Sequence, residues 1–181
     1  MSRSVSLLNR KRSHLLIVDV QEKLLPVISG NDRLAETITF LKQAAALFNV
    51  PVTTSEQYPQ GLGPTVQQLQ QADPVFEKTQ FSAADGFVSY RQSERDQVVL
   101  CGIEAHICVL QTAFDLSANG TRVFVVADGV GSRKDTDYQT ALQRLRDGGV
   151  TVCTAESVAF EWCESSANAQ FRELSKLVRS R

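Results

Sequence analysis

The sequence predicts an α/β fold: a three-layer, doubly wound and mostly parallel sheet of six strands with helices on both faces. Short runs dominated by apolar residues, such as His14–Val20 and Val98–Cys101, are typical of strands buried on both faces of a parallel sheet. These runs alternate with segments in which apolar residues recur every three to four positions, the period of a helix. No linker, repeat or low-complexity tract interrupts the pattern. A single domain is therefore expected over residues 1–181, with residues 1–13 as an N-terminal arm.

The expected elements alternate regularly along the chain. The remaining strands are expected at Pro51–Ser55, Pro74–Lys78, Thr121–Ala127 and Val150–Cys153. Helices are expected at Leu34–Phe48, Thr65–Gln71, Ala83–Gln92, from about Ala105 onward, Asp135–Asp147 and Ala167–Val178. Right-handed crossovers then give a doubly wound sheet whose strand carboxyl ends share one edge, where ligands bind in such folds. Asp128–Arg133 is expected to be a loop, with Asp128 in a turn or capping role.

The charge balance argues against two classes of partner. With 19 Lys and Arg, 20 Asp and Glu, and a formal net charge of -1, the chain has no basic surplus for nucleic acid or an anionic membrane. No apolar run approaches the roughly 20 residues of a membrane span. Neither nucleic acid nor a membrane is therefore expected as a partner.

The four cysteines show neither CxxC nor metal-ligand spacing. They are Cys101, Cys108, Cys153 and Cys163. Free thiols in a reduced, cytoplasmic protein are expected. The N-terminal arm is basic and could be read as a transit peptide. A strand starting near His14 leaves little chain to cleave, so an arm that frays or packs is favoured.

Cys108 is the candidate nucleophile. It falls in the first turn of a helix that starts immediately after the strand Val98–Cys101 and Gly102. A helix N-terminus carries partial positive charge and unpaired N–H groups, which stabilise a thiolate and bind anions. The alternative is a buried, inert thiol.

Two further side chains are expected beside Cys108. Asp19 follows the first strand and Lys78 ends the third, so both lie at the edge where Cys108 begins its helix. Asp19 can accept the thiol proton and return it to a leaving group, while Lys78 can lower the pKa of the thiol and hold the carboxylate. The pocket walls are expected to include Leu24, Tyr58 and Phe81.

His106 is an unlikely base for Cys108, although it is only two residues away. Side chains two apart on a helix point to different sides. The other histidine, His14, begins a strand at the opposite edge of the sheet. A Cys–His pair therefore has little support.

Three blocks of the sequence resemble the signature of the isochorismatase-like cysteine hydrolases, which include nicotinamidases and N-carbamoylsarcosine amidases. The blocks are L-L-I-V-D-V-Q, F-E-K-T-Q-F-S-A and C-G-I-E-A-H-I-C-V-L-Q-T-A. The resemblance runs from about His14 to Val158 and implies a catalytic triad of Asp19, Lys78 and Cys108. It also implies a cis peptide bond between Ile103 and Glu104, with the N–H groups of Glu104 and Cys108 directed at an oxyanion.

The chain departs from the nicotinamidase pattern after the second strand. Nicotinamidases carry metal-binding histidines there, whereas this chain reads S-E-Q-Y-P-Q-G with no histidine. No metal and no cofactor are therefore expected. The loop resembles that of small isochorismatase-domain proteins. True isochorismatases often lack the cysteine, so its presence favours acyl or amide chemistry.

The sequence therefore predicts a cysteine hydrolase that cleaves a small-molecule C–N bond, of the amide type, through a thioester. A homo-oligomer is expected, and the apolar segment with Phe160 and Trp162 could serve its interface. Two alternatives remain open. One is a non-catalytic or scaffold member of the fold, and the other is a thiol-redox sensor that pairs Cys108 with Cys101.

Overall fold

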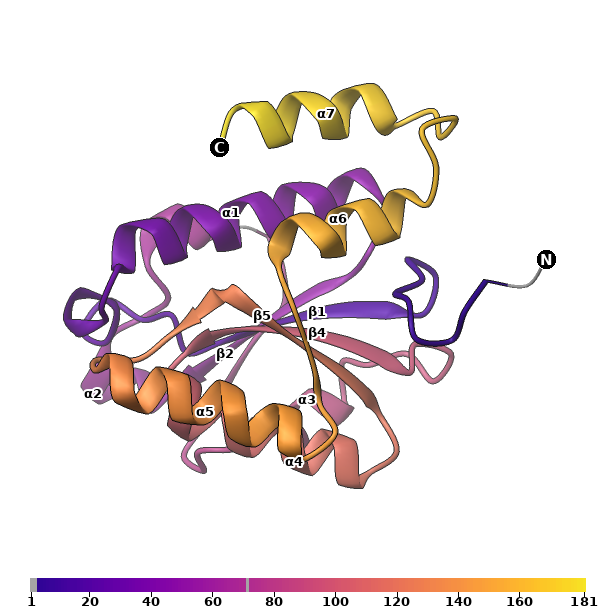
Figure 1. Cartoon of the computed structure of the whole chain (residues 1–181). Coiled ribbons are helices and arrows are strands. Elements are labelled where there is room, and N and C mark those ends of the chain that lie inside the picture. Colours follow the sequence, from indigo (N-terminus) through magenta and orange to yellow (C-terminus); the bar gives the residue numbers. More distant parts are fainter. Residues whose placement is uncertain (1–2, 71) are drawn as a thin grey trace.

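The computed structural model describes residues 3–70 and 72–181 and has one parallel sheet of six strands (Figure 1). The strands are β1 (Ser13–Val18), β2 (Val52–Gln57), β3 (Val75–Lys78), β4 (Gln97–Ile103), β5 (Arg122–Gly131) and β6 (Thr151–Cys153). Their order across the sheet is β3-β2-β1-β4-β5-β6, and every neighbouring pair is parallel. The predicted doubly wound α/β class is confirmed.

Helices cover both faces of the sheet. One face carries α1 (Asn31–Leu47), α6 (Ala155–Cys163) and, outside these two, α7 (Phe171–Arg179). The other face carries α3 (Ala84–Val88), α4 (Leu110–Ala118) and α5 (Asp135–Asp147). Short helical turns lie at η1 (Leu25–Val27), α2 (Pro59–Leu62), η2 (Gln67–Leu69) and η3 (Ala105–Val109), the last being a π-helical turn that leads into α4.

The apolar strands divide their side chains between two cores. In β1, Leu15 and Ile17 pack in the core beneath α1 and α6, while Leu16 and Val18 pack in the core beneath α4 and α5. All four are fully buried. A strand buried on both faces needs apolar side chains at successive positions, which explains why the sequence shows continuous runs rather than alternation.

The chain changes winding direction between β1 and β4. β2 and β3 extend the sheet on one side of β1, whereas β4, β5 and β6 extend it on the other. In such sheets the loops on either side of this switch diverge and leave a crevice at the strand carboxyl ends. The segments that follow β1 and β4 are therefore placed to line a site.

Gly102 makes the close approach of β1 and β4 possible. It is paired with Val18 and has a φ of 121°, a conformation that residues with a Cβ rarely adopt. A Cβ at this position would collide with the backbone carbonyl of Val18.

Two expected elements differ from the structure. Within the expected helix Thr65–Gln71, whose last residue lies outside the described residues, the chain forms only the turn η2. The reason is that the Thr65 amide donates to Glu56 and the Thr65 carbonyl accepts from the Gln70 side chain, so other partners compete with helical hydrogen bonds. The prediction of a loop at Asp128–Arg133 is wrong for its first part, because β5 continues to Gly131, which pairs with Ile103 on β4.

Helix α6 was absent from the expected elements. It begins at a capping box in which Thr154 and Ser157 exchange hydrogen bonds, and Asp128 accepts a hydrogen bond from the Ala155 amide at 2.8 Å. Asp128 therefore has the capping role that the sequence favours. Trp162 is fully buried and donates to Ser13 Oγ at 3.0 Å, so it is a core residue and not a residue of an exposed interface.

The N-terminal arm packs against the domain. Leu8 is fully buried, Arg12 forms an ion pair with Asp96, and the Gln97 side chain accepts from the Asn9 amide and donates to the Leu7 carbonyl. These contacts fix the arm across the amino ends of the strands.

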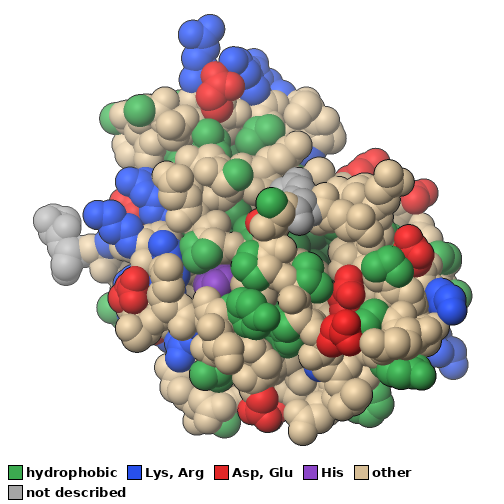
Figure 2. Space-filling view, turned by 180° about the vertical axis from the view of Figure 1, so that it is seen from behind, with side chains coloured by type: hydrophobic (Ala, Val, Ile, Leu, Met, Phe, Trp, Pro, Cys, Tyr) green, Lys and Arg blue, Asp and Glu red, His purple; other side chains and the backbone are tan. Residues whose placement is uncertain are grey.

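The surface mixes charged and apolar side chains. On the face shown in Figure 2, basic and acidic side chains are dispersed, with hydrophobic side chains among them. Within residues 3–70 and 72–181, no helix has the length and apolar character needed to cross a membrane.

We expect Gly102→Ala to destabilise the domain more than Gly120→Ala does. Both glycines have positive φ, but only the Cβ at Gly102 meets backbone, since the space around Gly120 is open. Gly102→Ala should lower the free energy of unfolding by at least about 1 kcal/mol more than the control. Urea denaturation measures the free energy of unfolding of both variants. Equal losses would show that the approach of β1 and β4 does not require glycine.

We expect His14 to make the fold acid-sensitive. Its ring lies against Phe87, its Nε2 is 2.9 Å from Thr53 Oγ1, and it is 2% exposed. Burial first, and then the charges of Arg95 and Arg91, lower the pKa of His14 from 6.5 to about 4. The folded state disfavours the proton, so stability is lost as the pH falls from 6.5 towards 4, by up to about 3 kcal/mol.

Chemical denaturation as a function of pH tests this expectation. The variant His14→Gln should show a smaller loss of stability over the same pH range, because it has no group to protonate there. A wild type whose stability is unchanged between these pH values would contradict the assignment.

Candidate active site

Three side chains from different strands meet at the carboxyl edge of the sheet. Asp19 comes directly after β1, Lys78 ends β3, and Cys108 lies in the π-helical turn after β4. Lys78 Nζ is 2.7 Å from Asp19 Oδ2, and the Cys108 thiol lies beside the same carboxylate. The expected acid, cation and thiol are thus brought together, with Asp19 between the other two.

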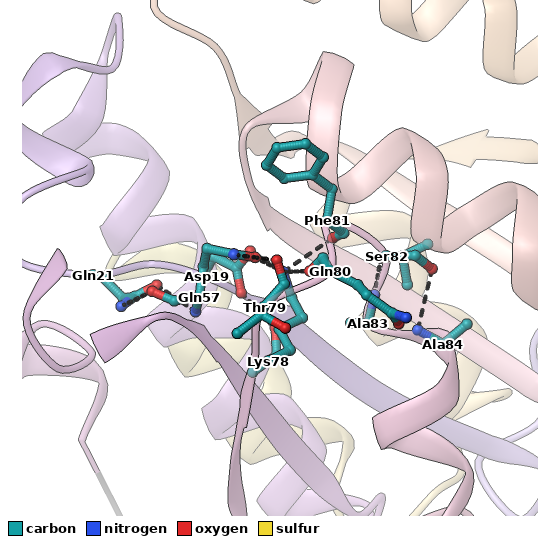
Figure 3. A network of polar contacts seen from close by, with 12 residues as sticks. Asp19, Gln21, Gln57, Lys78, Thr79, Gln80, Phe81, Ser82, Ala83 and Ala84 are labelled. Carbon is teal, nitrogen blue, oxygen red and sulfur yellow. Dashed lines mark hydrogen bonds and ion pairs between the residues drawn. The ribbon is translucent and has the colours of Figure 1, made fainter. Parts of the chain in front are cut away.

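Four oxygens surround the Lys78 ammonium (Figure 3). Nζ lies 2.7 Å from Asp19 Oδ2, 2.7 Å from Gln57 Oε1, 3.0 Å from the Phe81 carbonyl and 3.2 Å from the Gln80 carbonyl. An ammonium has three donor protons, so these acceptors engage all of them. The Lys78 side chain is 6% exposed, and its donors are therefore committed to the protein rather than to a ligand.

Two glutamines that sequence reasoning missed hold this ammonium in place. Gln57 ends β2 and is the register partner of Lys78 on β3, which puts its side chain beside Nζ. Gln21 is fully buried; its Oε1 accepts from the Gln57 amide at 2.7 Å, and its Nε2 donates to the carbonyls of Gln57 and Gly63. The available signal is the position of Gln21, two residues after Asp19 in the first block of the resemblance.

Asp19 is a buried carboxylate with two hydrogen-bond donors. It is fully buried, Ser55 Oγ donates to its Oδ1 at 2.7 Å, and Lys78 Nζ donates to its Oδ2 at 2.7 Å, while the Cys108 thiol lies beside it. Burial raises the pKa of Asp19, and the hydrogen bonds and the charge of Lys78 partly offset that rise. A raised pKa makes the carboxylate a stronger proton acceptor near neutral pH.

The pKa of Cys108 differs from the sequence-based expectation. Burial and the negative charge of Asp19 raise the pKa of Cys108 to about 12, and the charge of Lys78 offsets only part of this rise. The expected lowering of the thiol pKa is therefore wrong for the resting site, because desolvation outweighs the nearby cation. The thiol therefore rests protonated beside Asp19.

The backbone of Glu104 lies beside the sulfur at the start of the π-helical turn. It lowers the pKa of the Cys108 thiol, and the Glu104 carbonyl accepts from the amides of Ile107 and Val109 at 3.1 and 3.2 Å. The peptide bond between Ile103 and Glu104 is cis, the isomer that the resemblance implies. A π-helical turn is wider than an α-turn and is frequently found at functional sites.

His106 lies outside this arrangement. Its Nδ1 is 2.9 Å from Ser132 Oγ, and its Nε2 is 3.9 Å from Asp137 Oδ2. The ring is thus engaged by residues after β5 and at the start of α5, as expected for a side chain that does not pair with Cys108.

The expected pocket residues occupy different places. A cavity of about 330 Å³ opens beside Lys78, over the carboxyl ends of β2 and β3, and Tyr58 is one of its walls. Phe81 is 55% exposed, contributes its carbonyl to Lys78, and turns its ring away from the polar network (Figure 3). Leu24 packs against the core beneath α1. Among the described residues, no group of three or more His, Cys, Asp or Glu side chains is arranged to hold a metal ion.

Comparison with known proteins identifies the class that this fold and site define. The profile described as the isochorismatase domain matches residues 13–157. The chain is 41% identical over 175 residues to isochorismatase domain-containing protein 2 of Danio rerio, covering 94% of this chain and 89% of the relative. The chain therefore belongs to the isochorismatase-like hydrolase family.

Solved structures agree with this assignment. A protein described as MAR1 ribonuclease from Caenorhabditis elegans superposes with a TM-score of 0.87 at 35% identity, over 96% of this chain and 92% of that chain. The ycaC gene product of Escherichia coli, described as an octameric hydrolase of unknown specificity, shares the fold with a TM-score of 0.86 at 23% identity, over 99% of this chain and 98% of that chain.

We expect Asp19→Asn to lower the pKa of Cys108. The charge of Asp19 and its hydrogen bond to the thiol both raise that pKa, so the amide should move the midpoint of the pH–rate curve for alkylation downward. Lowering the pKa by one gives about tenfold more thiolate at a pH below the midpoint. Iodoacetamide labelling of Cys108 at several pH values measures it.

Asp128→Asn is the matched control, because Asp128 caps α6 and is not among the groups that shift the pKa of Cys108. It should leave the midpoint in place. A midpoint that stays unchanged or rises in Asp19→Asn would contradict the proton path from Cys108 to Asp19.

Proposed function

We propose that the protein is a cysteine hydrolase that cleaves an amide-type C–N bond of a small molecule through a thioester, with Asp19, Lys78 and Cys108 as its triad. The observation that carries the proposal is the chain of neighbours at the sheet edge: the Cys108 thiol lies beside the Asp19 carboxylate, and Asp19 is paired with Lys78 at 2.7 Å. The family membership supports hydrolysis, and the topological switch beside Asp19 and Cys108 supports a ligand site.

Acylation begins with a proton transfer. Asp19 takes the thiol proton as Cys108 Sγ attacks the substrate carbonyl carbon, so that an S–C bond forms and the carbonyl oxygen gains the negative charge. The N–H groups of Glu104 and Cys108 stabilise that oxyanion. The C–N bond then breaks, and Asp19 returns its proton to the leaving amine.

Deacylation reverses the roles. Asp19 takes a proton from water, the hydroxide attacks the thioester carbon, and the C–S bond breaks to release a carboxylic acid. The proton goes back to the sulfur, which restores the thiol. The raised pKa of Asp19 suits both halves of the cycle, because the group must accept and return one proton near neutral pH.

Lys78 is assigned an electrostatic role. Its ammonium compensates the buried carboxylate of Asp19 and fixes its orientation, since an unpaired charge at full burial is costly. All of its donors are used within the protein, so the substrate is recognised by other groups.

Two other activities are weaker fits. The name of the Caenorhabditis elegans structure suggests RNA cleavage, but the net charge of -1 gives no basic surplus for a polyanion. A redox pair with Cys101 has little support, because Cys101 is fully buried in β4 and burial raises its pKa.

The proposal extends to assembly and location. We infer a homo-oligomer, which the octameric description of the ycaC product supports, and a cytoplasmic location, which the four free cysteines support. The exposed side chains of Tyr58 and Phe81 at the rim of the site are candidates for the contact between subunits.

We expect Cys108→Ala to abolish hydrolysis. Wild type and variant are compared on a panel of small amides and esters and on an RNA oligomer, and loss of the nucleophile should lower turnover at least about 1,000-fold. Mass spectrometry of the wild type should find an acyl group on the peptide that contains Cys108.

Cys153→Ser is the matched control, because Cys153 is a partly buried thiol on β6, away from the triad. It should turn over the panel as the wild type does. Equal turnover by wild type and Cys108→Ala would remove Cys108 from the mechanism, and RNA cleavage that survives in Cys108→Ala would favour a different activity.

A further inference from the structure

The side chain of Glu104 is a nearly buried carboxylate next to the nucleophile. Its backbone N–H is one of the two proposed oxyanion donors and its backbone carbonyl anchors the π-helical turn, but its side chain has no part in the triad. The side chain is only 10% exposed. A buried carboxylate requires hydrogen-bond partners, and those of Glu104 come from the segment that follows β5.

Arg133 is the main hydrogen-bond partner of the Glu104 carboxylate. It follows the end of β5, whose Gly131 pairs with Ile103 immediately before Glu104. Arg133 Nε lies 2.9 Å from Glu104 Oε1, and the Arg133 backbone N–H donates to Oε2 at 3.2 Å. Nε also donates to Oε2 at 3.1 Å. Arg133 therefore holds Oε2 through both its side chain and its backbone, and its Nε lies close to Oε1 as well.

A second contact ties the same two segments together. Ser132 precedes Arg133, and its Oγ is 2.9 Å from Nδ1 of His106, a residue of the π-helical turn. The same nitrogen is 3.9 Å from Glu104 Oε2. Residues after β5 thus contact both Glu104, which precedes the π-helical turn, and His106, which lies within it. These contacts hold the turn in addition to the hydrogen bonds of its own backbone.

We infer that Arg133 and Glu104 form a strap between the end of β5 and the π-helical turn, and that this strap positions the Glu104 N–H for the oxyanion. The inference rests on the proposed function. Neither side chain touches the reacting atoms, so both act as positioning residues.

The electrostatics explain why the strap has an effect beyond that of an ordinary surface ion pair. Arg133 is 56% exposed, and such pairs contribute little to stability by themselves. Glu104 is the buried partner, and its carboxylate loses most of its compensation if the guanidinium is removed. It then has to turn towards water, and the peptide that carries its N–H is drawn with it.

The test uses two reactions at Cys108 that differ in whether an oxyanion forms. With p-nitrophenyl acetate, an S–C bond forms, the ester C–O bond breaks, and p-nitrophenolate leaves after negative charge has passed through the carbonyl oxygen. With dithiodipyridine, a new S–S bond forms, the reagent S–S bond breaks, and a thiopyridone leaves with the thiol proton. Mass spectrometry assigns both products to Cys108.

Arg133→Ala should slow acylation about 10-fold and leave disulfide exchange within about twofold, since a donor is misplaced rather than deleted and full deletion costs about 100-fold or more. Lys134→Ala removes the same charge from the next, exposed residue and should leave both rates unchanged. The double variant Glu104→Gln with Arg133→Ala should regain most of the acylation rate. A neutral amide needs no guanidinium, and the backbone donor at position 133 remains.

Two results would overturn the strap: acylation of Arg133→Ala at the wild-type rate, or an equal fall of both reactions, which would indicate general disorder of the site. Failure of the wild type to acylate at Cys108 would instead overturn the proposed function, and the strap with it. Recovery of the acylation rate in the double variant would distinguish a positioning role from a loss of folding, because a second substitution would not refold a protein that the first had unfolded.

Discussion

The buried ion pair between Asp19 and Lys78 is the interaction on which the rest of the site depends. A carboxylate with no exposure needs a compensating charge, and the cation comes from two strands away. The side-chain amide of Gln57 and the loop carbonyls after β3 lie around the cation, and Gln21 holds Gln57 through its backbone. The network thus extends from β1 across β2 to β3, and the sheet acts as the frame that fixes its distances.

The other half of the site depends on β4 and β5. The strand β4 approaches β1 closely enough to exclude a side chain at Gly102, which sets the sulfur of Cys108 against Asp19. Beyond the sheet, the end of β5 contacts the π-helical turn through Arg133 and Ser132. The groups proposed as proton acceptor and oxyanion donors are therefore supported by opposite halves of one sheet, with the thiol at their junction.

Much of the fold and part of the site could be predicted from the sequence. Doubly buried strands leave continuous apolar runs, and parallel topology places Asp19, Lys78 and Cys108 at one edge. The short turn η2 and the long β5 could not be predicted, because side-chain partners such as Glu56 and distant pairing with Ile103 decide them. Gln57 and Arg133 were missed for the same reason: each is defined by its partner across the sheet. The thiol pKa was misjudged because burial is invisible in sequence.

The protonated resting state of Cys108 has a consequence for how readily its sulfur is oxidised. Peroxide and other oxidants attack the thiolate, so a thiol whose pKa is raised to about 12 is a poor target while the site is empty. The same carboxylate that would draw off the proton during turnover keeps the sulfur inert between turnovers.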